Sequence, residues 1–296
     1  MGRSAKQSFG GDWTETKLAA LREYLVRYTA ALSSQPFILE YIDAFAGTGY
    51  REQREYQHED GTSLFKTSGD DGTDEYFDGS ARIALQIPRP FDRYTFVELS
   101  AEKAEELKSL KHQFPKLSDR ISIETKDANS YLVARATENW RAKGARAVVF
   151  VDPFGMQVEW ETIASLAKTE AIDLWLLFPV NAINRLLSKE GVRYRSWKER
   201  LDKVFGGEDW MSVFYRKVTD SSFFEPAAER LTKAIDIDGL TKYMVAKLKT
   251  VFAGVVDKPL ILSGKTGVPL FAFCFAASNK VGAPIAVRIA KHIVGK

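Results

Sequence analysis

The sequence predicts an α/β fold built on a mostly parallel sheet, and two observations support that prediction. Short apolar runs suited to buried strands recur along the chain, and segments with apolar residues three and four positions apart separate them. Strands that alternate with helices form parallel sheets with right-handed crossovers. We therefore expect the 296 residues to form one core with appendages.

The expected elements follow in chain order. A helix begins at the capping-box sequence Asp12-Trp-Thr-Glu15, ahead of the first strand. The predicted strands lie at 41–43, 94–98, 121–127, 147–152 and 172–178, and the helices between them at 101–113, 129–143 and 160–168. Segments 260–263 and 269–277 flank a glycine turn, which predicts an antiparallel hairpin at the sheet edge, and a helix over 283–294 follows.

The core is expected to comprise residues 1–180 and 255–296, with a helical subdomain at 181–254 that helps to bind substrate or a partner. Residues 50–78 are polar and too long for an ordinary strand-to-helix loop, which indicates a mobile lid or an acidic insertion. The chain has no run of about 18 apolar residues and no signal sequence. We expect a cytoplasmic protein without membrane contacts.

Cys274 is the only cysteine, which excludes an intrachain disulfide and a zinc site made of cysteines. It alternates with Phe273 and Phe275 in an expected strand, so a small buried thiol is the structural interpretation. No metal site is expected. Chemistry that needs a nucleophilic cysteine after the fourth strand is also disfavoured, because the sequence there is Asp-Pro-Phe-Gly at 152–155.

The most informative segment is Tyr41-Ile-Asp-Ala-Phe-Ala-Gly-Thr-Gly49, a strand that ends in an acid and enters a glycine-rich turn. It lacks the third glycine of the dinucleotide fingerprint and the Gly-Lys-Ser/Thr of a phosphate loop. With no lysine in the turn and an acid beside it, the segment favours a cationic adenosine derivative without phosphates. S-adenosylmethionine fits that description. The alternative is that the glycines only permit a tight turn.

Four consecutive predicted strands end on acidic residues, at Asp43, Glu98, Asp127 and Asp152. In an open parallel sheet ligands bind outside the carboxyl ends of the strands, so these acids are expected on one rim. Glu98 would accept hydrogen bonds from both ribose hydroxyls, and Asp127 would receive the exocyclic amine of adenine. Asp43 would shape the glycine turn and face the cationic end of the cofactor.

A helix before the first strand is expected to cover the amino-acid end of the cofactor, so its polar residues are candidates for the carboxylate. For each of them an ordinary capping turn or an exposed side chain is the structural alternative. The complete predicted cofactor set is Thr14, Lys17, Asp43, Phe45, Ala46, Gly47, Gly49, Glu98, Asp127 and Ala128.

The predicted catalytic residues are Asp152, Pro153 and Phe154. An exocyclic base amine is a poor nucleophile, because its lone pair is delocalised into the ring. A carboxylate and a backbone carbonyl that each accept one N–H favour a pyramidal nitrogen aimed at a methyl donor. Asp152 and the Pro153 carbonyl would supply these acceptors, and Phe154 would stack on the base. A helix-initiating Asp-Pro turn is the structural alternative.

The net charge is +3, and the densest basic stretch spans 185–203. Aromatic residues are interleaved with the charges there, a composition that suits a phosphate backbone and unstacked bases. The predicted substrate-binding residues are Arg193, Arg195, Trp197 and Lys198, and the predicted partner is nucleic acid. A solvated helix with two core aromatics is the alternative.

The chain resembles the three-Cys-motif partner protein (TcmP) family over nearly its whole length. The resemblance lies in Asp12-Trp-Thr, Lys17-Leu18, 41–49, Gly79-Ser80, Phe96-Val-Glu98, Val151-Asp-Pro-Phe-Gly155, Ile172-Asp-Leu-Trp175 and Phe275-Ala-Ala-Ser-Asn279. It implies a Rossmann-like class I methyltransferase sheet and association with a three-Cys-motif protein. Asp-Pro-Phe-Gly is also similar to the fourth motif of tRNA guanine-N2 dimethyltransferases, and departs from the Asp-Pro-Pro-Tyr of adenine-N6 enzymes.

Three functions therefore remain open. The first is an S-adenosylmethionine-dependent N-methyltransferase that acts on a nucleobase in nucleic acid. The second is methylation of a protein or a small molecule, for which residues 181–253 would form a closed pocket. The third is a cofactor-binding partner subunit without turnover.

Overall fold

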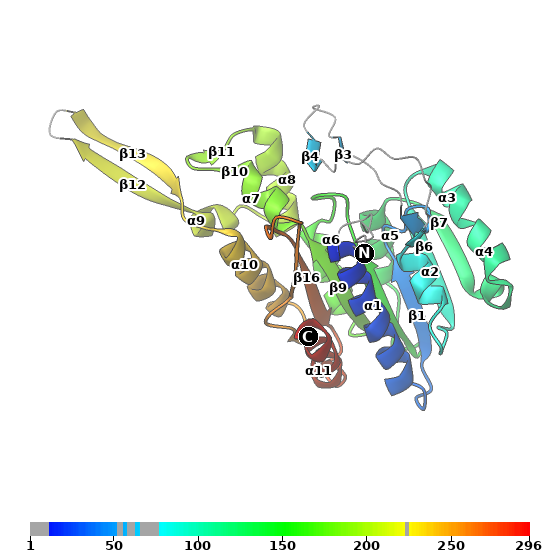
Figure 1. Ribbon diagram of the computed structural model, residues 1–296. Coiled ribbons are helices and arrows are strands. Elements are labelled where there is room, and N and C mark those ends of the chain that lie inside the picture. Colours follow the sequence, from blue (N-terminus) through cyan, green and yellow to red (C-terminus); the bar gives the residue numbers. More distant parts are fainter. Residues whose placement is uncertain (1–11, 52–55, 58–62, 66–76, 223–224) are drawn as a thin grey trace, which may run out of the picture.

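An eight-stranded sheet forms the centre of the molecule, and the five predicted apolar runs are five adjacent strands of it (Figure 1). Its strands are β1 (Ile38–Asp43), β6 (Arg93–Glu98), β7 (Ile121–Thr125), β8 (Ala145–Val151), β9 (Ile172–Phe178), β14 (Gly254–Val255), β15 (Leu260–Ser263) and β16 (Pro269–Ala277). The spatial order is β14-β16-β9-β8-β1-β6-β7, with β15 also paired to β16. The first five strands are parallel and β16 is antiparallel to β9, so the predicted fold class and terminal hairpin are confirmed.

The structure, a computed structural model, describes residues 12–51, 56–57, 63–65, 77–222 and 225–296. Most of the predicted lid or acidic insertion at 50–78 lies outside these residues. Its described parts are two short antiparallel pairs, β2 (Tyr50–Arg51) with β5 (Phe77–Asp78), and β3 (Tyr56–Gln57) with β4 (Ser63–Phe65). Among the described helices, none is long and apolar enough to cross a membrane.

Side chains alternate across the sheet, and each face has its own buried core. Tyr41, Phe150 and Trp175 lie on one face, whereas Ile42 and Val149 lie on the other. Because successive strand residues point to opposite faces, Asp43 follows Tyr41 and Asp152 follows Phe150 onto the first face. The parity of the strands therefore places two of the predicted site acids on the same side.

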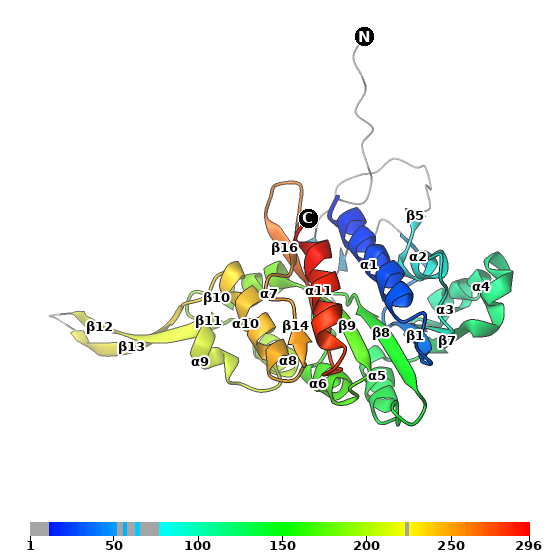
Figure 2. The same ribbon diagram turned by 90° about the horizontal axis from the view of Figure 1, so that it is seen from below.

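Helices cover both faces of the sheet (Figures 1 and 2). The first face carries α1 (Asp12–Ala31), α2 (Ser80–Leu85), α3 (Ala101–Leu107), α4 (Ser109–Gln113) and α11 (Ala283–Val294). The second carries α5 (Ala128–Ala136), α6 (Trp160–Lys168), α7 (Val180–Leu186), α8 (Arg195–Phe205), α9 (Trp210–Phe214) and α10 (Ile237–Lys249). A 3₁₀ helix, Pro115–Arg120, precedes β7.

One predicted helix is interrupted and another ends earlier than the apolar periodicity indicates. The helix expected over 101–113 is interrupted at Lys108, whose N–H donates to the Glu105 carbonyl three residues back. The helix expected over 129–143 ends at Ala136, because the Trp140 indole N–H folds back onto the Arg135 carbonyl at 2.9 Å. A side-chain hydrogen bond satisfies a terminal carbonyl there in place of a further helical turn.

Residues 181–254 contain the expected helices, but also two hairpins that the sequence did not predict. The short hairpin pairs β10 (Leu187–Ser188) with β11 (Gly191–Val192). The long one pairs β12 (Tyr215–Ser222) with β13 (Glu225–Lys233), and this ribbon projects away from the body of the molecule (Figures 1 and 2). The Lys233 ammonium connects the base of this ribbon to the end of α7. It donates to the Asn184 and Leu187 carbonyls at 3.0 and 3.2 Å.

Candidate functional site

The glycine turn after β1 is held against the neighbouring strand. Gly47 and Gly49 have φ of 61° and 80°, a region that favours glycine. A Cβ on Gly49 would lie 3.3 Å from the Leu107 side chain, whereas a Cβ on Gly47 would meet nothing within 4 Å. The Ala46 N–H also donates to the Val97 carbonyl at 3.0 Å. The turn is therefore fixed at Gly49 and leaves open space beside Gly47.

Glu98, at the end of β6, binds the same turn. Its Oε2 accepts from the Gly47 N–H at 3.0 Å, and its Oε1 accepts from the Ser100 N–H at 2.8 Å. The residue is 8% exposed. The sequence assigned Glu98 to a ribose, and the structure adds a structural role that the sequence did not reveal. Each carboxylate oxygen has a second lone pair, so the same group can also accept from a ligand hydroxyl.

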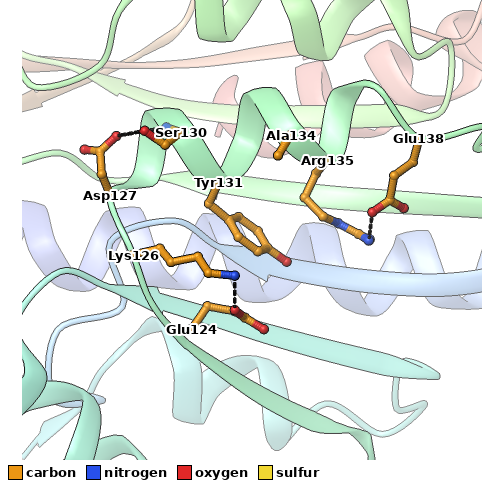
Figure 3. A pocket seen from close by; sticks show the side chains of 8 residues that line it. All are labelled: Glu124, Lys126, Asp127, Ser130, Tyr131, Ala134, Arg135 and Glu138. Atoms are coloured by element: carbon orange, nitrogen blue, oxygen red, sulfur yellow. Dashed lines mark hydrogen bonds and ion pairs between the residues drawn. The ribbon is translucent and has the colours of Figure 1, made fainter.

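Asp127 caps helix α5. Its Oδ1 accepts from the Ser130 N–H at 2.8 Å and from the Ser130 hydroxyl at 3.0 Å, while the side chain stays exposed and the following Ala128 is buried. A hollow of about 600 Å³ lies beside it, along α5 and β7 (Figure 3). Ion pairs line this hollow, Lys126 with Glu124 and Arg135 with Glu138. Asp127 is the only predicted cofactor residue in its lining.

Asp43 lies behind the glycine turn and has no exposed surface. Its Oδ1 accepts from the Phe45 N–H at 3.3 Å, and Oδ2 is buried without a hydrogen-bond partner. Burial raises the pKa of Asp43 to about 7, although a hydrogen bond from Ser80 opposes the shift. The position agrees with the prediction that Asp43 shapes the turn. A direct contact with a cofactor requires this side chain to be uncovered.

Asp152 and Lys17 form an ion pair between β8 and α1. The Lys17 side chain is 6% exposed and that of Asp152 is 27% exposed. The ammonium also lies over the rings of Trp13 and Phe150, at 5.4 and 5.8 Å from their centres. The structure thus joins a predicted cofactor residue to a predicted catalytic residue, a contact that the sequence did not indicate.

The loop after Asp152 faces outward. Pro153 is buried, Phe154 is 40% exposed, and Gly155 turns the chain with φ of 71°. The Phe154 N–H donates to the Gln157 side chain at 3.2 Å. Lys103, from α3, lies 5.3 Å from the centre of the Phe154 ring. Lys103 is a residue of this rim that sequence reasoning missed, because nothing in its local pattern sets it apart from other helix lysines.

The remaining predicted cofactor residues neighbour Lys17 or the glycine turn in the sequence. Thr14 is half-buried one turn before Lys17, at the start of α1, and Trp13 beside it packs on Phe271 with ring centres 4.9 Å apart. Phe45 is half-buried against the core of the opposite sheet face, and Ala46 is buried on the first face. One rim of the sheet therefore contains the glycine turn, Asp43 behind it, Glu98 beside it, and the N-terminal part of α1.

The predicted substrate strip lies on α8 and the residues before it, in the part of the chain between β9 and the projecting ribbon. Arg195 pairs with Glu199 at 2.8 Å, and Lys198 pairs with Asp202 and Glu208 at 2.9 Å. The rings of Tyr194 and Trp197 meet edge to face at 4.4 Å. Arg193 is exposed. Much of the positive charge in this strip is therefore balanced by acids on the same surface.

Comparison with known proteins gives structural similarity only. No family model matches the chain, and no curated protein matches its sequence. The solved structures that resemble it include protein LPL1258 from Legionella pneumophila, with 15% identity, coverage of 82% of this chain and 94% of that one, and a TM-score of 0.39. The methyltransferase domain of bacterial CtHen1-C has 12% identity, coverage of 87% and 98%, and a TM-score of 0.36.

A third similar structure is magnesium protoporphyrin IX methyltransferase from Synechocystis with bound SAM, at 12% identity, coverage of 78% and 87%, and a TM-score of 0.29. Values this low assign no residue and no substrate. The chain's own topology is a Rossmann-like, mostly parallel sheet in which an antiparallel strand, β16, lies beside β9. The resemblance to the TcmP family remains a prediction.

Proposed function

We propose that this protein is an S-adenosylmethionine-dependent methyltransferase that methylates a nitrogen of a nucleobase in nucleic acid. One observation supports it above the others. A glycine turn with open space at Gly47 lies beside Glu98, on the same rim as a carboxylate that can face a nucleophile, Asp152. The turn contains no lysine or arginine for phosphates, so a phosphate-free adenosine cofactor suits it best.

The residues around the turn fit such a cofactor. Glu98 is held in place by two backbone N–H groups, and its remaining lone pairs would accept from ribose hydroxyls. Lys17 supplies a buried positive charge for a carboxylate, and Asp127 retains one carboxylate oxygen for the adenine amine. Once bound, S-adenosylmethionine supplies an activated methyl group.

The chain's own task is to bind and orient the nucleophile. The Asp152 carboxylate and the Pro153 carbonyl would each accept one N–H of an exocyclic amine, so that the nitrogen lone pair points at the methyl group. Phe154 is exposed enough to stack on the base, and the Lys103 ammonium beside its ring adds positive charge at the entrance. The basic residues 193–198 would bind the phosphate backbone.

The proposal is tested by incubating the protein with methyl-labelled S-adenosylmethionine and with total RNA, DNA and protein from the host. The expected result is label in a nucleoside, located by digestion and mass spectrometry on an exocyclic nitrogen, and strongly reduced label with Asp152→Asn. Label confined to protein or to small molecules would replace the nucleic-acid substrate with the second function. Tight cofactor binding with no transfer, also in the presence of a three-Cys-motif protein, would support a partner subunit.

A further inference from the structure

The ion pair between Lys17 and Asp152 connects two roles that the proposed function keeps separate, cofactor binding and substrate binding. Lys17 comes from α1 and would hold the carboxylate of the cofactor, whereas Asp152 follows β8 and would hold the amine of the substrate. In the structure each is the charge partner of the other. While the pair stays closed, each side chain neutralises part of the charge that the other would offer to a ligand.

Two carboxylates, Asp43 and Asp152, lie on the same face of adjacent strands, and Lys17 is the cation that acts on both. Burial is the main cause of the raised pKa of Asp43; the charge on Asp152 raises it further and the charge on Lys17 lowers it. The Tyr41 hydroxyl beside them is buried and finds no hydrogen-bond partner.

The surroundings of Lys17 also restrict where it can go. Its ammonium lies over the Trp13 and Phe150 rings, and its side chain is 6% exposed. A buried ammonium needs a counter-ion, because an isolated charge in such an environment is costly. A second carboxylate that enters the site therefore meets a lysine that already has a partner, and the two anions must share or exchange it.

We propose that Lys17 is a shared cation that couples the two halves of the site. Without cofactor it neutralises Asp152. The carboxylate of the bound cofactor competes for the ammonium and loosens its hold on Asp152, which becomes free to accept the substrate amine. This inference rests on the proposed function. It favours an order of events with the cofactor first and the nucleophile second, because the Asp152 carboxylate accepts the amine more strongly once Lys17 has another anion.

Two ligands separate this coupling from simple binding. S-adenosylhomocysteine carries the carboxylate of the amino-acid end, and methylthioadenosine contains the same adenosine and sulfur without it. If Lys17 is shared, the Asp152→Asn variant releases Lys17 for the ligand carboxylate. We expect calorimetry to show that this variant binds S-adenosylhomocysteine about 3- to 10-fold more tightly, with unchanged affinity for methylthioadenosine.

The Lys17→Met variant provides the second half of the cycle. We expect it to bind S-adenosylhomocysteine at least about 10-fold more weakly and to remove the effect of Asp152→Asn in the double variant. An effect that persists in the double variant would mean that Asp152 only repels the ligand, and the proposal would be wrong. Lys17→Arg, which keeps the charge if Lys17→Met folds poorly, should preserve the effect. Lys108→Met, an exposed lysine elsewhere, is the matched control.

The outcomes also separate this inference from the proposed function. If wild-type protein binds S-adenosylhomocysteine and Asp152→Asn leaves that affinity unchanged or weakens it, the shared-cation role is overturned and the cofactor assignment stands. If wild-type protein binds neither ligand, the proposed function fails, and the inference that depends on it fails with it.

Discussion

The Gly47 N–H donates to Glu98 Oε2 over 3.0 Å and thereby joins the turn after β1 to the end of β6. The other carboxylate oxygen of Glu98 accepts from the Ser100 N–H, so the side chain is held from two sides. A group held in this way loses little conformational freedom when a ligand arrives. Glu98 is therefore both part of the turn's structure and the proposed ribose acceptor.

We expect Glu98→Gln to weaken the affinity for S-adenosylhomocysteine by about 1.5–3 kcal/mol, because the amide offers one acceptor oxygen in place of two. Calorimetry measures the affinity, and thermal unfolding reports how much of the effect is structural. Glu102→Gln, in the exposed first turn of α3, is the control and should change neither quantity. Unchanged affinity in Glu98→Gln would remove the ribose assignment.

Asp152→Asn should separate binding from chemistry. Its contacts with the reacting nitrogen form mainly in the transition state, so we expect methyl transfer to fall at least about a hundredfold without loss of cofactor affinity. The asparagine is the better test than Asp152→Ala, which would leave a gap beside the buried Lys17 ammonium and could destabilise the protein. Wild-type turnover in both variants would show that Asp152 is structural.

The salt dependence of nucleic-acid affinity tests whether the basic strip binds phosphates. Reversing the charges of Arg193, Arg195 and Lys198 should weaken nucleic-acid binding and flatten its dependence on salt, by about 0.7–0.9 in logarithmic slope for each phosphate that the protein no longer binds. Because Arg195 and Lys198 already pair with acids, we expect Arg193→Glu alone to produce much of the change. The control is Lys291→Glu on α11. An unchanged salt slope would mean that the strip is a solvated surface without phosphate contacts.

The pH dependence of the free energy of unfolding should contain a contribution from Asp173, at the start of β9. Its Oδ2 accepts from the buried Tyr24 hydroxyl at 2.6 Å, and burial raises its pKa from 3.8 to about 7. The native state therefore binds more protons than the unfolded state between these values. The contribution of this group to stability is fully present below pH 3.8 and is lost as the pH rises through about 7.

We expect Asp173→Asn, which still accepts from Tyr24, to gain stability relative to wild type as the pH rises from 4 to 8, by on the order of a few kcal/mol. Denaturant unfolding at several pH values measures this difference. Asp119→Asn, an exposed carboxylate, should show no such trend. A constant difference between Asp173→Asn and wild type across the range would contradict the raised pKa.

The sequence was sufficient to predict the sheet. Five apolar runs became parallel strands, and the helix over 160–168 has the predicted bounds. The period of two also fixes Tyr41 and Asp43 on one face, and Phe150 and Asp152 on that same face. Local pattern is enough for such predictions, because burial on both faces demands continuous apolar residues.

Long-range pairs and exposed elements could not be predicted in the same way. Lys17 and Asp152 are 135 positions apart, and their contact depends on how α1 crosses the sheet, which no local pattern records. The projecting ribbon of β12 and β13 was not predicted, because its sequences YRKVTDSS and EPAAERLTK lack the alternation of apolar and polar residues from which strands are predicted. The Trp140 hydrogen bond that ends α5 depends likewise on a side chain folding back.

The most direct test of the cofactor assignment is equilibrium binding to wild-type protein, measured by calorimetry with S-adenosylmethionine, S-adenosylhomocysteine, ATP and NAD under identical conditions. A turn that lacks both the lysine of a phosphate loop and the third glycine of the dinucleotide fingerprint, beside a fixed carboxylate, should bind the first two with dissociation constants of about 1 μM or lower, and ATP and NAD far more weakly. Tighter binding of ATP or NAD, or no binding of S-adenosylmethionine and S-adenosylhomocysteine, would contradict the assignment.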